Sequence, residues 1–155
     1  MKRGNWKILV ISLVIVYAAA FIGSLFTSAN VNSDWYVQNK PGITPPNFVF
    51  PIAWNILFFL IALSLYFAWI YSNNNQKKKV AIIFGINLFL NILWSFLFFR
   101  LQNPHLAFFE LIFLWLTIWI MIFITYKAKK LSAYLLIPYL GWVSFAGILN
   151  YLWVF

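Results

Sequence analysis

Side-chain amides and aromatic rings recur at helical spacing within long apolar stretches of this chain. Asn87, Asn91, Trp94 and Phe98 follow at intervals of four, three and four residues, which places two amides, an indole and a phenyl ring on one helical stripe. Polar side chains are costly inside a membrane and tend to face a bundle interior or a cavity. Such a face can hydrogen-bond and stack against a flat molecule. Asparagines also bond helix to helix, at about 0.6 kcal/mol on average, and the pair alone does not separate the two uses.

Two further stripes carry the same residue types. Trp54 and Phe58 are four residues apart in a second stretch, and Trp142, Ala146 and Asn150 are spaced by four in the last one. Rings four residues apart lie on the same helix face. Ala146, one turn from Trp142, would leave room for a flat ring beside the indole.

Convergence of these stripes favours a binding pocket over separate packing roles. Any single tryptophan here is more often part of the core or of an interfacial belt, and Trp6 and Trp153 fit a belt. Trp54, Trp94 and Trp142, however, all fall toward the same membrane side of their stretches. We therefore predict that they meet in one pocket.

A polar, proline-rich segment, Thr27 to Pro46, separates the first two apolar stretches. Structureless connections of about twenty residues are usually disordered or functional, often as lids. Prolines such as Pro45 fix the backbone, and Trp35 and Tyr36 supply large amphipathic rings. We expect a lid over the pocket, with these three residues in contact with the ligand.

Other chemistries find little support in the sequence. There is no cysteine, and His105 is the single imidazole, so we expect no metal site and no resident cofactor. Glu110 lies about one turn into an apolar stretch; a snorkelling or helix-capping acid with Arg100 or His105 as partner is the expected role, and a proton carrier or a partner for a cationic group is the alternative. No phosphate loop, Ser-His-Asp pattern or pair of carboxylates is present.

The elements that must position these residues are membrane-spanning helices. The chain is 65% hydrophobic and only 8% charged, whereas soluble domains have roughly 25% charged residues. Continuous stretches of about 20 apolar residues are long enough to cross a bilayer as helices. They are Ile8–Phe26, Phe48–Tyr71, Val80–Phe99, Leu106–Tyr126 and Ser132–Phe155. We predict an all-α integral membrane protein, a single domain over residues 1–155, built as a five-transmembrane-helix bundle with a long lid loop between the first two helices.

The basic residues predict an orientation. Only Lys40 and Arg100 fall on the lid side of a five-span bundle. Those on the other side are Lys2, Arg3, Lys7, Lys77, Lys78, Lys79, Lys127, Lys129 and Lys130. The positive-inside rule then places the N-terminus in the cytoplasm, with a bacterial plasma membrane as the expected location. Lysines at span ends set topology, and we expect no nucleic-acid partner.

Small residues at four-residue spacing suggest close helix contact. Ala19 and Gly23, and Ala20 and Ser24, form two such pairs in the first stretch. Small-xxx-small spacing lets helix backbones approach closely. Homodimerisation through this helix and packing within one bundle are equally consistent with the pattern.

The ordered set of motifs resembles the TspO/MBR family, which comprises tryptophan-rich sensory proteins and the translocator protein, or peripheral benzodiazepine receptor. The matching elements are Gly23-Ser24, Trp35-Tyr36, Lys40-Pro41, Pro45-Pro46, Phe50-Pro51, Trp54, Asn91, Trp94, Leu136-Ile137-Pro138-Tyr139, Trp142, Phe145-Ala146 and Leu149-Asn150. The chain differs from the family pattern at Ile43, where a tryptophan is common, and at Asn87, where glutamine is common. Tyr151 is followed by no basic residue, so the cholesterol pattern of the family is incomplete.

The resemblance implies five helices, often in a homodimer, with a pocket under the first loop that binds porphyrins and benzodiazepine-like drugs. It also implies that Trp54, Phe58, Asn91, Trp94, Trp142 and Ala146 line this pocket. Some bacterial members are associated with light-dependent breakdown of protoporphyrin, for which Trp54 and Trp142 are the candidate catalytic residues.

Three functions follow as hypotheses. The first is a membrane receptor or sensor for tetrapyrroles or other flat lipophilic molecules. The second is a photooxidative porphyrin-degrading enzyme, whose chemistry would come from the excited porphyrin and oxygen. The third is a transporter of porphyrin or another lipophile, against which the absence of an internal repeat argues.

Overall fold

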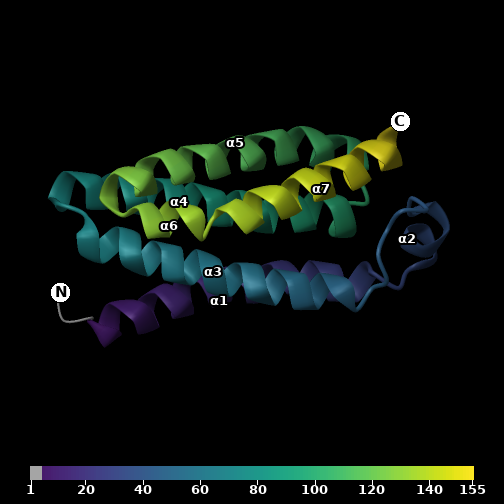
Figure 1. Ribbon diagram of the computed structural model, residues 1–155. Coiled ribbons are helices and arrows are strands. Elements are labelled where there is room, and N and C mark those ends of the chain that lie inside the picture. Colours follow the sequence, from purple (N-terminus) through teal and green to yellow (C-terminus); the bar gives the residue numbers. More distant parts are fainter. Residues whose placement is uncertain (1–4) are drawn as a thin grey trace.

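The computed structural model describes residues 5–155, and the long helices of this part of the chain lie side by side in one bundle (Figure 1). Lys2 and Arg3 lie outside the described residues. In chain order the helices are α1 (Trp6–Asn30), α2 (Asp34–Asn39), α3 (Val49–Tyr71), α4 (Asn74–Ser95), the π-helix η1 (Phe96–Arg100), α5 (Pro104–Ala128), α6 (Lys130–Tyr134) and α7 (Ile137–Val154).

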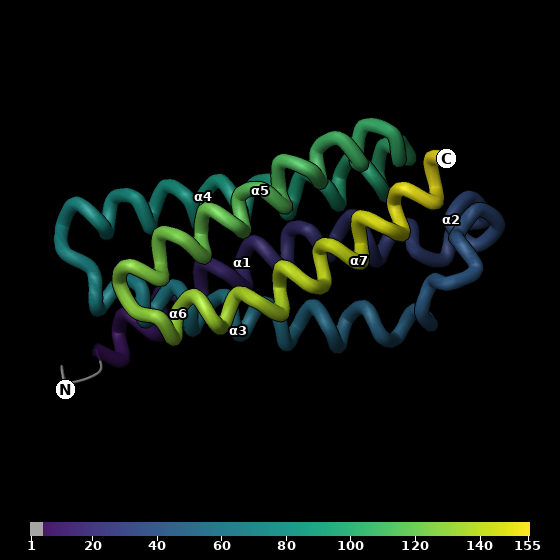
Figure 2. The backbone as a smooth tube through the Cα atoms, turned by 45° about the horizontal axis from the view of Figure 1, so that its top comes forward, coloured from purple at the N-terminus to yellow at the C-terminus, as the bar shows by residue number. Residues whose placement is uncertain are grey.

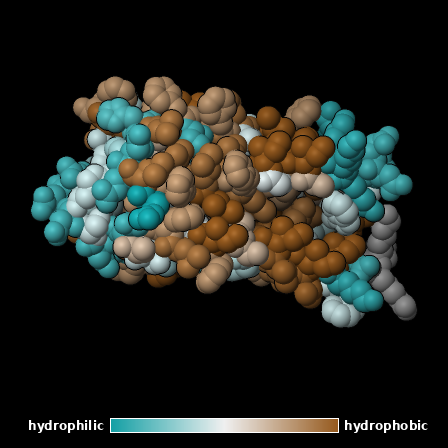
Figure 3. Space-filling view, turned by 180° about the vertical axis from the view of Figure 1, so that it is seen from behind, coloured by the Kyte–Doolittle hydropathy of each residue, from teal (hydrophilic) through white to brown (hydrophobic). Residues whose placement is uncertain are grey.

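Five of these helical units are long and apolar enough to cross a membrane. They are α1, α3, α4 with η1, α5, and α6 with α7. The shortest of them has 23 residues, which at 1.5 Å per residue reaches about 35 Å, more than the hydrocarbon core of about 30 Å. Figure 3 shows the matching surface, with hydrophobic residues around the middle and hydrophilic ones at both ends. The predicted all-α, five-helix membrane fold is confirmed.

Polar residues in the short connections fix where the helices begin. The Asn73 side chain accepts a hydrogen bond from the Gln76 N–H, and the Gln76 side chain accepts one from the Asn73 N–H, a reciprocal capping box at the start of α4. Asn103 caps α5 by accepting from the Leu106 N–H at 3.0 Å, and Pro104 occupies the first turn, where its missing N–H costs nothing. The turn signals between the apolar stretches therefore act as caps.

The two ends of the bundle differ in charge. Figure 2 shows α2 and the C-terminus at one end, and the N-terminus with the α3–α4 and α5–α6 turns at the other. Lysines gather at this second end, where the ammonium group of Lys127 lies 4.3 Å from the Phe123 ring centre and that of Lys129 lies 4.5 Å from the Tyr71 ring centre. Such contacts suit an interfacial layer of aromatic and basic residues. The cytoplasmic placement of this end remains a prediction.

The last span is two helices rather than one. It was expected as a single helix over Ser132–Phe155, but α6 ends at Tyr134 and α7 begins at Ile137. Pro138 has no N–H to offer the carbonyl of Tyr134, so an uninterrupted α-helix would lose a hydrogen bond there. The break lies near the lysine-rich end and leaves α7 free to follow its own direction along the bundle.

A serine pair fastens the short helix α6 to α3. Ser64 Oγ donates to the carbonyl of Ser132 at 2.8 Å, and Ser132 Oγ donates to the carbonyl of Ser64 at 2.7 Å. Both serines are fully buried. Because each hydroxyl donates a hydrogen bond to a backbone carbonyl of the other helix, the pair joins α3 to the last span in the lysine-rich half of the bundle.

The small residues of α1 are used inside the bundle. Ser12, Val16, Ala19 and Gly23 form one buried stripe, and a Cβ placed on Gly23 would lie 3.7 Å from Ser95 Oγ of α4. This face of α1 therefore packs within the same chain. Homodimerisation remains a prediction.

Removing one hydroxyl of the serine pair should destabilise the protein. Interhelical hydrogen bonds in membranes contribute about 0.6 kcal/mol on average and about 1.7 at most, so Ser64→Ala should lower the free energy of unfolding by an amount in this range. Reversible unfolding in mixed micelles measures it. Each hydroxyl donates to the backbone carbonyl of the other serine, so Ser132→Ala should cost a similar amount and the double variant should cost more than either single change; a double variant as stable as the unmodified protein would contradict the role of the serine pair.

Candidate ligand-binding cavity

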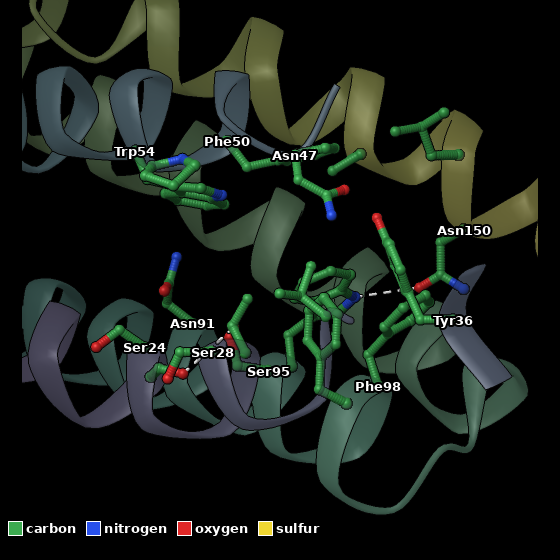
Figure 4. Close-up of a pocket in the computed structure, with 18 of the residues that line it drawn as sticks. Ser24, Ser28, Tyr36, Asn47, Phe50, Trp54, Asn91, Ser95, Phe98 and Asn150 are labelled. Atoms are coloured by element: carbon green, nitrogen blue, oxygen red, sulfur yellow. Dashed lines mark hydrogen bonds between the residues drawn. The ribbon is translucent and has the colours of Figure 1, made fainter. Parts of the chain in front are cut away.

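A cavity of about 300 Å³ lies in the half of the bundle that faces α2. Its walls come from α1, α3, α4 with η1, and α7, and the connection between α1 and α3 contributes residues at its outer end. Figure 4 shows Phe50, Trp54 and Asn47 on one side of the space and Asn91 and Ser95 on the other. Ligand pockets typically enclose about 300–1,000 Å³, so this space is at the small end of that range.

Aromatic rings form most of the wall on both sides. Trp54 stacks on Phe58 of α3 with ring centres 5.3 Å apart, and Trp94 stacks on Phe98 at 5.0 Å. Trp142 of α7 packs edge-on against Phe50, with ring centres 5.9 Å apart and an angle of 71° between the ring planes. The flat faces and edges of these rings are the surfaces that a planar ligand would stack against.

A second aromatic group, carried by α2, lies at the outer end of the cavity. Trp35 and Tyr36 pack against Phe98 and Trp153, with ring centres between 5.1 and 5.7 Å apart in the three pairs Trp35–Trp153, Tyr36–Trp153 and Trp35–Phe98. Tyr36 is only 4% exposed, and burial raises the pKa of its phenol above the ordinary 10.0. Its hydroxyl therefore keeps its proton at neutral pH and can donate a hydrogen bond.

The assignment of Trp153 to an interfacial belt was wrong. Its ring stacks on Tyr36, and it borders the cavity. Trp6, by contrast, is 67% exposed, as a belt residue should be. Position at the end of the chain indicated depth in the membrane, but not which way the ring points.

A π-helix sets the direction of the rings at this end. In η1 the N–H of Leu101 bonds to the carbonyl of Phe96, five residues earlier. One such turn inside an α-helix is rare and is frequent at functional sites. Here Phe98 and Phe99 are both buried and both border the cavity.

A chain of buried hydrogen bonds runs from the cavity into the bundle core. Asn91 Nδ2 donates to Tyr139 Oη at 3.2 Å, Tyr139 Oη donates to Asn87 Oδ1 at 3.1 Å, and Asn87 Nδ2 donates to Thr117 Oγ1 at 2.9 Å. Asn87 is fully buried, and it does not border the cavity. The chain links α4, α5 and α7 and holds Asn91 at the cavity wall.

Asn150 fixes a second wall residue. Trp94 Nε1 donates to Asn150 Oδ1 at 3.1 Å, and Asn150 Nδ2 donates to the carbonyl of Pro104 at 2.8 Å. The indole of Trp94 is thereby oriented by α7 and by the start of α5. Its N–H is already used, so Trp94 offers a ligand its ring face.

Two polar atoms of the α1–α3 connection are buried without a hydrogen-bond partner. They are Thr44 Oγ1 and Asn47 Oδ1, and both residues border the cavity. Asn47 Nδ2 donates to Asn32 Oδ1 at 3.3 Å, which leaves the carbonyl oxygen free to accept. Unsatisfied buried polar groups cost about 1–3 kcal/mol, so a ligand that bonds to them would relieve a cost already present in the fold.

The lining of the cavity carries no charged side chain. Within residues 5–155 no group of three or more His, Cys, Asp and Glu side chains could hold a metal ion. Glu110 does not border the cavity, and its expected role is wrong: it is 7% exposed rather than snorkelling, and neither carboxylate oxygen has a hydrogen-bond partner among the described residues. Depth along a helix did not reveal which face the acid occupies.

The cavity brings together most of the residues singled out in the sequence. Eight of them border it: Tyr36, Trp54, Phe58, Asn91, Trp94, Trp142, Ala146 and Asn150. Three do not: Trp35 packs behind Tyr36 against Phe98, Asn87 is held in the core, and Pro45 lies outside the lining. The two candidate catalytic tryptophans, Trp54 and Trp142, are both present in the wall.

Sequence reasoning missed the wall that α1 supplies. This wall consists of Ala20, Gly23, Ser24, Thr27, Ser28 and Val31. These residues are spaced as on one helical stripe, so the sequence did contain a signal for this wall. The small residues among them were interpreted only as sites of close contact between helices. Phe50, one turn before Trp54, was an equally readable signal. Thr44 and Asn47 had no periodic pattern to mark them.

Fold and cavity define a class: a five-span membrane protein with an aromatic cavity beside the connection between its first two spans. The sequence profile of the TspO/MBR family matches residues 11–154, and the chain belongs to this family.

Named relatives agree with this membership. The chain is similar to the tryptophan-rich protein TspO of Archaeoglobus fulgidus, with 44% identity over 92% of each chain. It is similar to the protein of the same name from Chlorobaculum tepidum, with 35% identity over 95% of each chain. It is also similar to protein CrtK of Rhodobacter capsulatus, with 30% identity over 76% of this chain and 74% of that one.

Loss of the Trp153 ring should loosen α2. Trp153→Ala removes the contacts with Trp35 and Tyr36, so the backbone amides of Asp34–Asn39 should exchange with deuterium faster, as expected for a segment with few remaining buried contacts. Hydrogen exchange read by mass spectrometry measures this. Tyr151→Ala, which removes an exposed ring of the same helix, is the control; equal exchange of α2 in both variants would show that the ring group does not hold it.

Proposed function

We propose that this protein is a membrane receptor that binds flat, lipophilic ring systems, such as tetrapyrroles or benzodiazepine-like drugs, in the cavity beneath α2. The observation that carries the proposal is the wall itself, in which the rings of Trp54, Trp94 and Trp142 from three separate helices border one cavity. Membership of the TspO/MBR family, with relatives named for their tryptophan content, is consistent with the proposal.

The energetics favour a planar aromatic ligand. Aromatic contacts contribute about 0.5–1.5 kcal/mol each beyond the burial of area. Three tryptophan rings would together supply up to about 4.5 kcal/mol, and burial of the ligand's apolar surface adds to this. Dissociation constants near the micromolar range, about −8.2 kcal/mol, are then reasonable.

Polar atoms on the wall would form hydrogen bonds with groups at the edges of the ligand. Thr44 Oγ1 and Asn47 Oδ1 have no partner in the structure, and Asn91 is held at the wall by Tyr139. These groups bond to neutral donors and acceptors. Because burying an unpaired carboxylate is very costly, the chamber favours an uncharged ligand, and a porphyrin would keep its propionates at the mouth.

Binding should depend on the wall tryptophans. Addition of protoporphyrin should quench the tryptophan fluorescence of the protein, and Trp54→Ala and Trp142→Ala should each weaken binding by about tenfold, the equivalent of 1.4 kcal/mol. Trp119→Ala removes a half-exposed ring from the lipid-facing side of α5 and should leave the dissociation constant unchanged. Absence of quenching, or equal binding by all three variants, would refute the receptor hypothesis.

The charge of the ligand provides a separate test. Because the lining is uncharged, protoporphyrin dimethyl ester should bind at least as tightly as the free diacid at pH 7, whether measured by quenching or by calorimetry in the same detergent. Lys40, in the connection, directly precedes Pro41 of the lining. Much tighter binding of the diacid, lost in Lys40→Gln, would show that a charge pair at the mouth dominates recognition.

A further inference from the structure

An apolar groove on the outer surface of the bundle lies directly behind the cavity wall. It runs between α3 and α7 and is formed by Ala53 and Ile56 of α3, Pro138, Gly141 and Phe145 of α7, and Trp142. Trp142 also borders the cavity. The Trp142 indole therefore lies between the cavity and a surface that faces the hydrocarbon of the bilayer.

The seam between α3 and α7 is the weakly joined part of the wall. Hydrogen bonds hold α3 to α6 through Ser64 and Ser132, and to α1 through Tyr17 Oη, which donates to Asn55 Oδ1 at 2.9 Å. Between α3 and α7, no hydrogen bond is found among the described residues. The ring contacts that cross this seam are edge-on.

Those edge-on contacts are Phe50 against Trp142, with ring centres 5.9 Å apart, and Trp54 against Tyr139, at 6.3 Å. A rotation of the Trp142 side chain would break the first of them without breaking any hydrogen bond that the structure shows. Side-chain rotation of this kind is far faster than the opening of a helix bundle.

We propose that Trp142 is a lateral gate, and that a lipophilic ligand dissolved in the bilayer enters the cavity through the α3–α7 groove. The proposal rests on the proposed function. A hydrophobic ring system concentrates in lipid, and the groove presents it with an apolar path that starts at exposed Ile56 and Gly141. The buried Tyr36 ring and its neighbours lie at the outer end of the chamber.

Gly141 offers a way to obstruct the groove without disturbing the fold. A Cβ built on Gly141 meets no atom within 4 Å, and the same holds for Gly85 of α4, which is also exposed. Both glycines are inside helices, so their replacement by phenylalanine has the same effect on helix propensity. Gly141→Phe would fill the groove, whereas Gly85→Phe would add the same ring to a remote lipid-facing surface.

The kinetic test uses the full chain in phosphatidylcholine nanodiscs and protoporphyrin dimethyl ester as the ligand. Stopped-flow quenching should show association and dissociation both slowed by about tenfold in Gly141→Phe, with a dissociation constant within about twofold of the original, because a blocked path changes rates and not equilibrium. Gly85→Phe should match the unmodified protein. An unchanged association rate in Gly141→Phe, or a change confined to dissociation, would overturn the gate.

A second measurement does not depend on porphyrin binding. Brominated phosphatidylcholine quenches the fluorescence of indoles that touch acyl chains. The fluorescence due to Trp142 is the difference between the emission of the unmodified protein and that of Trp142→Phe. Brominated lipid should quench the Trp142 fluorescence in the unmodified protein, and Gly141→Phe should protect it. If the unmodified protein bound no porphyrin, the proposed function would fail, and this quenching would still decide whether the groove gives lipid access to Trp142. A Trp142 signal insensitive to brominated lipid would overturn the gate.

Discussion

Apolar side chains gain little by leaving lipid for a neighbouring helix, so helices in a bilayer are held together by close packing and by hydrogen bonds. In this protein the hydrogen bonds from Asn91 through Tyr139 and Asn87 to Thr117 join α4, α5 and α7 into one unit. Each of these polar groups would be costly to leave unpaired in the core. The unit therefore has a defined geometry, and the cavity exists because α1 and α3 stand against it without filling the space at the α2 end.

The contrast between this hydrogen-bonded unit and the unfilled space at the α2 end explains why the two halves of the bundle differ. In the lysine-rich half the Ser64–Ser132 pair draws α3 against α6, and buried aliphatic side chains such as Ile61 and Met121 complete a tight core. In the other half, tryptophan and phenylalanine rings replace aliphatic packing and leave room between them. The same five helices thus form a tightly packed lysine-rich half and a second half that contains the cavity.

Much of this could be predicted from the sequence, because each inference depended on a local pattern. Uninterrupted apolar stretches identified the spans, and four-residue spacing placed Trp54 with Phe58 and Trp142 with Ala146 on the faces that border the cavity. The direction of a residue outside such a pattern could not be predicted. Trp153 and Glu110 both lie near span ends, where the sequence indicates depth in the membrane but not the direction in which the side chain points. Asn87 shares a stripe with Asn91 and also bonds to Tyr139, yet its second bond, to Thr117, holds it in the core away from the cavity.

The residues of the α1–α3 connection were beyond prediction for another reason. Thr44 and Asn47 reach the cavity because α2 folds back onto Phe98 and Trp153, a contact between segments more than sixty residues apart in the chain. No periodicity encodes such a contact. The sequence indicated an ordered connection through its prolines and rings, and only the folded chain shows which of its atoms face inward.

The π-helix at the end of α4 has a consequence for how this family of cavities can diverge. A π-turn accommodates one residue more than an α-turn over the same length, and in a regular α-helix each residue turns the chain by about 100°. Deleting a single residue between Phe96 and Arg100 would therefore remove the extra residue and convert η1 to an α-turn, so that only the side chains of the turn itself would change direction. The loss of one codon could thereby replace the phenylalanine rings of η1 at the cavity wall with other side chains, while every membrane span stayed in place.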